Sequence, residues 1–149
     1  MNSLLERSAR ELYPGYFALV MATGIVSISA YLMGMVAVAW LLFVFNNAAY
    51  AALWLLTLVR LFRYHRNLTA DVISHGKGPG FLTIVAGTCI LGNQYLLLAD
   101  QRTAAISLWF LAVLLWCLLM YAFFTAMTIR EPKPSLETGL NGSWLLTVV

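Results

Sequence analysis

The sequence predicts an all-α, polytopic membrane protein made of repeated transmembrane helical hairpins, and two observations carry this prediction. Of the 149 residues, 62% are hydrophobic and only 10% are charged, with a mean hydropathy of +0.83. Soluble domains are about 45–50% apolar and about 25% charged, and a chain this short cannot hide so much apolar surface in one core. The apolar residues also form runs long enough to cross about 30 Å of hydrocarbon, where helices satisfy their own backbone groups.

Four apolar runs and the start of a fifth define the expected helices, in one membrane domain over residues 1–149. They cover residues about 17–35, 36–60, 81–99 and 103–129, and a fifth begins at 142. Gly34 marks a soft boundary between the first two runs, and Asp100-Gln101-Arg102 separates the third from the fourth. Pro132 and Pro134 follow the fourth helix, because proline cannot continue a helix.

Basic residues are distributed unevenly between the ends of these helices. One side holds eight Lys and Arg residues and the other holds Arg102 alone; the eight are Arg7, Arg10, Arg60, Arg63, Arg66, Lys77, Arg130 and Lys133. Cytoplasmic loops are enriched in Lys and Arg, so we expect a cytoplasmic N-terminus in the cell (inner or plasma) membrane. The net charge of +3 then indicates contact with anionic lipid, with no role in nucleic-acid binding. A cleaved signal peptide is the weaker alternative, because the first apolar run is long and has no clear cleavage site.

An internal repeat relates the first and third apolar runs. An offset of 64 residues aligns FALVMATGIVSISAY (residues 17–31) with FLTIVAGTCILGNQY (residues 81–95), with three of fifteen positions identical. Each of these runs, and the fifth, begins with a glycine near an aromatic residue: Gly15-Tyr16-Phe17, Gly80-Phe81 and Gly142-Ser143-Trp144. The regular spacing predicts a repeating helical hairpin.

The two members of each hairpin differ in composition. The first members are rich in Gly, Ala, Ser, Thr, Asn and Gln, whereas the fourth run reads SLWFLAVLLWCLLMYAFF, with bulky apolar residues around its whole circumference. The second run is intermediate, because Asn46-Asn47 and four alanines interrupt it. Small and polar residues belong where helices touch or water enters, and bulky apolar ones suit lipid. We therefore expect inner odd-numbered helices and outer even-numbered helices.

The inner helices carry weakly polar, uncharged faces. In the third run one arc of about 120° holds Thr83, Ala86, Gly87, Ile90, Asn93 and Gln94, with Thr88 and Gly92 nearly opposite. In the first run Thr23, Ser27, Ala30 and Gly34 lie on one line. Such faces are either helix–helix contacts or the wall of a solute path. The adjacent amides of Asn93 and Gln94 favour a solute path, because one neighbouring helix seldom satisfies both.

Sequence patterns for catalysis, cofactors or metal are absent. The segment Gly76-Lys77-Gly78-Pro79-Gly80 lacks the spacing and the Ser/Thr of a phosphate-binding loop and is interpreted as a turn before a helix. His65 and His75 are too sparse for a metal site, and Cys89 and Cys117 are interpreted as buried thiols. The arginines at 60, 63 and 66 are interpreted as a membrane-surface cluster. We expect no enzyme, no cofactor and no metal.

Three stretches together resemble a known family of membrane proteins. They are PGYFALVMATGIVSI, GPGFLTIVAGTCILGNQ and REPKPSLETGLNGSWLLTVV, and the resemblance covers nearly the whole chain. The family is the tellurite-resistance/dicarboxylate transporter family, whose relatives include yeast malate and sulfite transporters and the plant guard-cell slow anion channel. The resemblance implies a ten-helix domain of five hairpins, of which this chain is the N-terminal portion, often assembled as a trimer. The family's phenylalanine gate lies in a later helix with no counterpart here.

The resemblance also implies a function and candidate residues. It implies transport of small anions of the C4-dicarboxylate, tellurite or sulfite type through a central pore of inner helices in the lipid bilayer. The candidate pore-lining residues are Thr23, Gly24, Ser27, Thr83, Gly87, Asn93 and Gln94. The alternative is a truncated, non-transporting membrane protein, or a subunit that serves packing or assembly. The sequence pattern does not specify which anion is carried, the direction of transport or the coupling ion.

Overall fold

The structure is a computed structural model that describes residues 14–63, 71–72, 78–129 and 145. The described part is helical and contains no strand. Its elements are η1 (Pro14–Phe17), α2 (Ala18–Leu32), α3 (Val36–Arg63), η2 (Gly78–Phe81), α5 (Leu82–Leu97) and α6 (Arg102–Ile129). Four helical segments are long and apolar enough to span a membrane: Gly15–Leu32, Val36–Arg63, Gly78–Leu97 and Arg102–Ala126. The predicted all-α membrane fold is thus confirmed, whereas the predicted fifth helix lies outside the described residues apart from Leu145.

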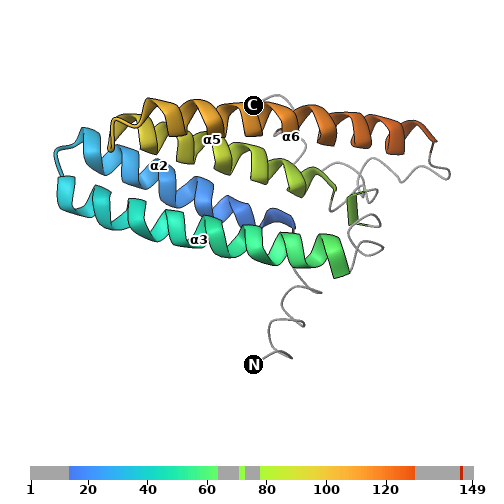
Figure 1. Cartoon of the computed structure of the whole chain (residues 1–149), viewed down its shortest axis with the longest axis horizontal. Helices are drawn as coiled ribbons and strands as arrows, with labels where there is room; N and C mark the ends of the chain where they lie inside the picture. Colours follow the sequence, from blue (N-terminus) through green and yellow to red (C-terminus); the bar gives the residue numbers. More distant parts are fainter. Residues whose placement is uncertain (1–13, 64–70, 73–77, 130–144, 146–149) are drawn as a thin grey trace.

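The four long helices form two antiparallel hairpins (Figure 1). Helices α2 and α3 form the first hairpin, and α5 and α6 form the second. Both inter-helix turns lie at one end of the bundle, and the end of α3 lies at the other. Arg60 and Arg63 therefore lie at the end opposite Arg102, as the predicted charge asymmetry requires.

Each hairpin turns through one residue with a positive φ angle. Gly34 has φ of 81°, and the backbone N–H groups of Gly34 and Met35 donate to the carbonyls of Tyr31 and Ala30, at 3.0 and 2.9 Å. This Schellman arrangement satisfies the carbonyls at the end of α2, and glycine adopts its left-handed conformation without a steric penalty. In the second hairpin Asp100 takes this role, with φ of 49°.

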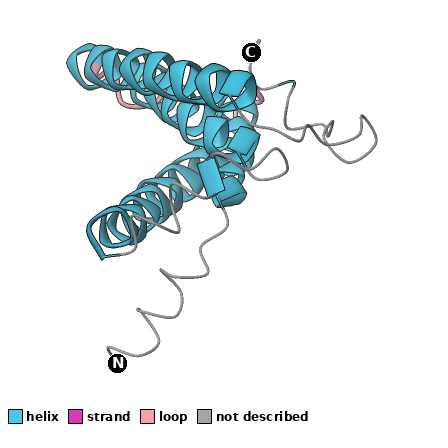
Figure 2. Cartoon of the chain, turned by 90° about the vertical axis from the view of Figure 1, so that its right-hand side faces the viewer, coloured by secondary structure: helices cyan, strands magenta, loops and turns pink. Residues whose placement is uncertain are grey.

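The first members of the hairpins pack against each other, so that α2 and α5 are the inner pair. Helix α2 packs on α3 and on α5, and α5 packs on α2 and on α6. More of α5 is buried than of any other described spanning segment, and least of α6. In Figure 2 the helices form the two arms of a V. The predicted arrangement, with odd helices inside and even helices outside, is what these four helices show.

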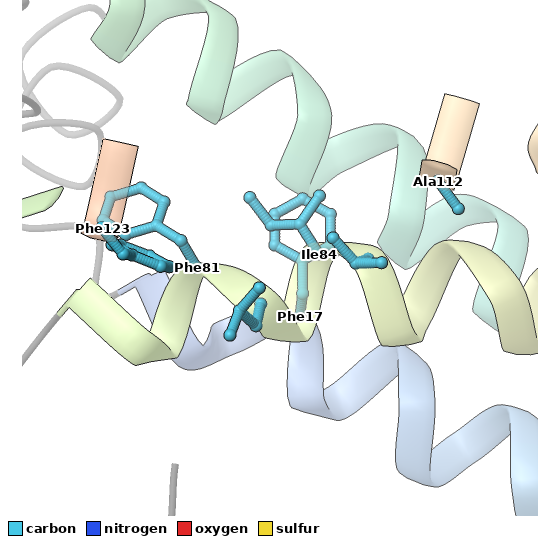
Figure 3. Packing of buried hydrophobic residues seen from close by; sticks show 7 residues of the cluster. Phe17, Phe81, Ile84, Ala112 and Phe123 are labelled. Atoms are coloured by element: carbon cyan, nitrogen blue, oxygen red, sulfur yellow. The ribbon is translucent and has the colours of Figure 1, made fainter. Parts of the chain in front are cut away.

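An aromatic cluster fills the core where the inner helices begin. Phe17 of η1 and Phe81 of η2 are 2% and 5% exposed and pack with Ile84, Ala112 and Phe123 (Figure 3). Phe17 also makes edge-on contacts with Tyr50 and Trp54 of α3, with ring centroids 6.1 and 6.2 Å apart. The glycine–aromatic entries recognised in the repeat are therefore the residues that anchor both inner helices in one cluster.

Candidate functional site

Three helices meet at a buried pair of amide side chains. Asn46 of α3 donates from Nδ2 to Oε1 of Gln94 of α5 at 2.6 Å, and neither side chain has exposed surface. Gly24 of α2 lies against the pair: a Cβ at this position would come within 3.0 Å of Asn46 Nδ2 and 3.2 Å of Gln94 Oε1. We call Gly24, Asn46 and Gln94 the amide junction. It exists because α2 has no side chain at the point where the two amides cross it.

The hydrogen bond satisfies only half of the polar groups in the amide junction. Asn46 Oδ1 and Gln94 Nε2 are buried and have no hydrogen-bond partner among the described residues. A buried polar group without a partner destabilises a structure by about 1–3 kcal/mol. One short hydrogen bond therefore holds the amide pair, while the two remaining polar atoms of the pair oppose its burial.

Two further side-chain hydrogen bonds join α3 to α5 beside the junction. Tyr95 donates to Asn47 Oδ1 at 2.6 Å, and the hydroxyls of Tyr50 and Thr88 lie 2.9 Å apart. The backbones of α3 and α5 make few close contacts of their own, so these long side chains bridge the space between the helices. The hydroxyl of Thr88, at the centre of α5, is fully buried and also donates to the Ile84 carbonyl at 2.7 Å.

Small residues on the inner helices mark three different contacts. Gly87 allows α5 to approach η1, where a Cβ would lie 3.3 Å from the Phe17 carbonyl oxygen. Gly92 faces α6, where a Cβ would make ordinary contacts of 3.6 Å with Ala105 and Leu108. Ser27 is fully buried and donates to the Ala39 carbonyl of α3 at 2.8 Å. All three positions serve helix packing in this structure.

Asn93 is the one candidate residue with an exposed side chain. It lies on the exposed face of α5, which we define as Ala86, Ile90, Asn93 and Leu97, residues that are half-buried or exposed along one side of the helix. It also borders a groove of about 360 Å³ between α5 and α6; the lining residues are Cys89, Gly92, Asn93, Leu96, Arg102, Ala105, Ile106 and Trp109. The groove thus brings Asn93 and Arg102 to the same side of the second hairpin.

The seven candidate pore-lining residues differ in how exposed they are. Asn93 is exposed, whereas Gly24, Ser27, Thr83, Gly87 and Gln94 are buried in contacts among the described elements, and Thr23 is half-buried. Thr83 donates to the Gly80 carbonyl at 2.7 Å, at the start of α5. The predicted arc therefore has a buried edge and an exposed edge, and its pore-lining role stays a prediction.

Asn46 is the residue of this site that the sequence pattern did not single out as a candidate. Its helix was interpreted as intermediate because Asn46-Asn47 interrupts an apolar run. The signal was therefore present, since an amide in a membrane span needs a partner. The identity of that partner, Gln94, depends on how the hairpins pack and is 48 residues away.

Arg60 corrects one sequence-based interpretation. The sequence predicts a membrane-surface cluster for the arginines at the end of the second run, but helix α3 continues to Arg63 and Arg60 is only 3% exposed. Its guanidinium forms an ion pair with the carboxylate of Asp71, which is also largely buried. The pairing explains how a cation is tolerated in this position, because a buried charge needs a compensating partner.

Chemistry beyond hydrogen bonding is limited in the described part of the chain. No group of three His, Cys, Asp or Glu residues there is arranged to hold a metal ion. Cys89 and Cys117 are free thiols; Cys89 is half-buried, but Cys117 is exposed, so the interpretation of Cys117 as a buried thiol is wrong. The charged groups lie at helix ends, and the interior offers amides, hydroxyls and backbone groups. Such an interior can interact with a solute only through weak dipoles and hydrogen-bond donors.

The helices and their weakly polar interior define a multi-pass helical membrane protein. A comparison with protein families identifies which one: the model described as voltage-dependent anion channel (SLAC1) matches residues 11–149, and the chain belongs to this family. The family consists of channels or transporters rather than enzymes, and membership implies anion transport across a membrane. No curated protein and no solved structure shows a significant match to the chain.

Proposed function

We propose that this protein carries small anions of the C4-dicarboxylate, tellurite or sulfite type through a path walled by its inner helices. The family assignment supports anion transport, and the resemblance to the tellurite-resistance/dicarboxylate transporters supports these substrates. We further propose that it resides in the cell membrane with a cytoplasmic N-terminus, within a ten-helix domain, and that it assembles as a homotrimer. The positions of Arg60 and Arg63 opposite Arg102 support the orientation.

The exposed Asn93 is the observation that carries the proposal. An anion needs hydrogen-bond donors, and Asn93 is the amide of an inner helix that is accessible from outside the described bundle. Arg102 lines the same groove at the first residue of α6, where unpaired backbone N–H groups add partial positive charge. Asn93 and Arg102 give the groove a positive entrance and a weakly polar wall, and no charged side chain lines it deeper among the described residues.

Flux measurements in proteoliposomes test the proposal. The purified protein should move malate or sulfite down its gradient, and Asn93→Leu should lower this flux by about tenfold, the equivalent of one hydrogen bond to a charged group. Asn47→Leu is the matched control, because Asn47 is bonded to Tyr95 in the interior. Equal flux in the Asn93→Leu variant and the wild type would remove Asn93 from the path. No flux of any of these anions by the wild type would contradict the function itself.

A second candidate function has support from the buried residues. Most of the candidate polar residues have hydrogen-bond partners within the two hairpins, and neighbouring residues fill the space beside the candidate glycines. A packing or assembly subunit requires such contacts. In that case the chain would bind other membrane helices and carry no anion. Wild-type proteoliposomes without flux, together with stable co-purification of the chain with further helices, would favour this candidate.

A further inference from the structure

Gln94 of the amide junction lies next to the exposed face of α5, although its side chain is buried. Gln94 is the immediate neighbour of Asn93, and residues 90, 93, 94 and 97 lie on the same side of the helix, at spacings of three and four. Ile90 and Asn93 reach the exposed face, but the Gln94 side chain is fully buried. Gln94 lies about 100° around the helix from Asn93, and its side chain reaches into the bundle toward Asn46 instead of toward the exposed face.

Two contacts hold Gln94 in the buried direction. The first is the bond from Asn46 Nδ2 to Gln94 Oε1. The second is the close approach of α2 at Gly24, where an added Cβ would overlap Ile90 and crowd both amides. Against these contacts stands the buried Gln94 Nε2, a donor that has no partner among the described residues. A donor in that state gains by turning toward water or an anion once the Asn46 bond is lost.

We propose that Asn46 is a positioning residue that withholds the Gln94 amide from the anion path, so that the number of donors presented by α5 depends on the amide junction. With the junction closed, the exposed face of α5 offers the amide of Asn93 between apolar residues. With the junction open, the Nε2–H groups of Gln94 join it on the same side of the helix. The inference rests on the proposed function for its flux readout, whereas the position of Gln94 can be measured separately.

The chain suits a direct measurement of the Gln94 side chain. It has only two glutamines, Gln94 and Gln101, so selective ¹⁵N labelling of glutamine side chains gives two amide signals. Gln101 lies in the turn before α6 and is exposed, and Gln101→Glu assigns the remaining signal to Gln94. In lipid nanodiscs the wild-type Gln94 side-chain amide should exchange with solvent slowly, because it is buried.

Two variants open the junction in different ways. Asn46→Leu removes the donor that holds Gln94, and Gly24→Ala keeps both amides but crowds them. Each should accelerate exchange of the Gln94 side-chain amide by about tenfold or more. This factor corresponds to the loss of the contribution that one hydrogen bond makes to stability. Thr57→Val is the control on the same helix, because Thr57 donates to the Leu53 carbonyl within α3, and this variant should leave the Gln94 signal protected. Both opening variants must retain the helical circular dichroism of the wild type.

Flux in proteoliposomes then tests the consequence for the anion. Asn46→Leu should raise sulfite or malate flux several-fold, and Gln94→Leu in the same chain should abolish the increase. A Gln94 amide that stays protected in both opening variants would overturn the positioning role. Faster exchange with unchanged flux, in a wild type that transports, would show that Gln94 turns away from the path and would also overturn the inference. Absence of flux in the wild type contradicts the proposed function, and the exchange measurement still decides the position of Gln94.

Discussion

At the scale of single residues, the glycines of the inner helices have different tasks that their sequence context does not reveal. Gly24 and Gly92 both lie inside helices and both are buried. A Cβ at Gly24 would overlap Ile90 and approach two amides, whereas a Cβ at Gly92 would meet neighbours at ordinary van der Waals distances. Of these two glycines, Gly24 is therefore required for close approach, whereas Gly92 could be replaced.

Alanine substitution should separate these two glycines. We expect Gly24→Ala to lower the free energy of unfolding by about 1–3 kcal/mol, because overpacking of a filled interior is destabilising by that amount. Gly92→Ala should be neutral or stabilise the protein by up to about 1 kcal/mol, because alanine favours a helix over glycine. Thermal unfolding in detergent, followed by circular dichroism, measures both. A Gly24→Ala variant as stable as Gly92→Ala would contradict the close contact.

At the scale of helices, composition was enough to predict which members lie inside, but not which residues meet. Small and polar residues collected on the first member of each hairpin, and those members, α2 and α5, are the ones that pack together. A helical arc shows which residues share a direction, but not which neighbour covers it. Asn93 and Gln94 illustrate this: they are adjacent in sequence and about 100° apart, and α3 covers only Gln94.

The bridge between α3 and α5 can be measured as a coupling energy. Tyr50→Phe and Thr88→Val each remove one hydroxyl of the bonded pair, so a double-mutant cycle isolates their interaction. We expect about 0.6 kcal/mol, with an upper value near 1.7 kcal/mol, as for other hydrogen bonds between membrane helices. Tyr121→Phe on the exposed surface of α6 combined with Thr88→Val should give no coupling. Zero coupling for the Tyr50–Thr88 pair as well would show that the two hydroxyls do not interact in the membrane.

At the scale of the whole molecule, the two turns and the two charged ends define an axis across the membrane. Gly34 and Asp100 lie in turns at one end, near Arg102, and Arg60 and Arg63 close the other end of α3 (Figure 1). The sequence predicted this polarity from the distribution of basic residues alone. It did not predict that one of those bases, Arg60, would be buried in an ion pair, because its partner follows eleven positions later in a connecting segment.

The proposed orientation predicts which side of the membrane reaches the α5–α6 turn. With Cys89 and Cys117 replaced by serine, Gln101→Cys should react with a membrane-impermeant maleimide in intact cells and not in cytoplasm-side-out vesicles. Gln101 is exposed in the turn, so its cysteine is accessible to the reagent on one side only. Labelling in the vesicles and not in the cells would reverse the orientation.

The hydrogen bonds from α3 to α5 also bear on how the chain is made. Asn46, Asn47 and Tyr50 all find their partners across the interface on α5, a helix that is synthesised later. During synthesis the first hairpin therefore reaches the membrane with three polar side chains that lack those partners, a state that lipid disfavours. We therefore expect the second hairpin to supply these partners, so that the two hairpins assemble in the membrane cooperatively and not as independent segments.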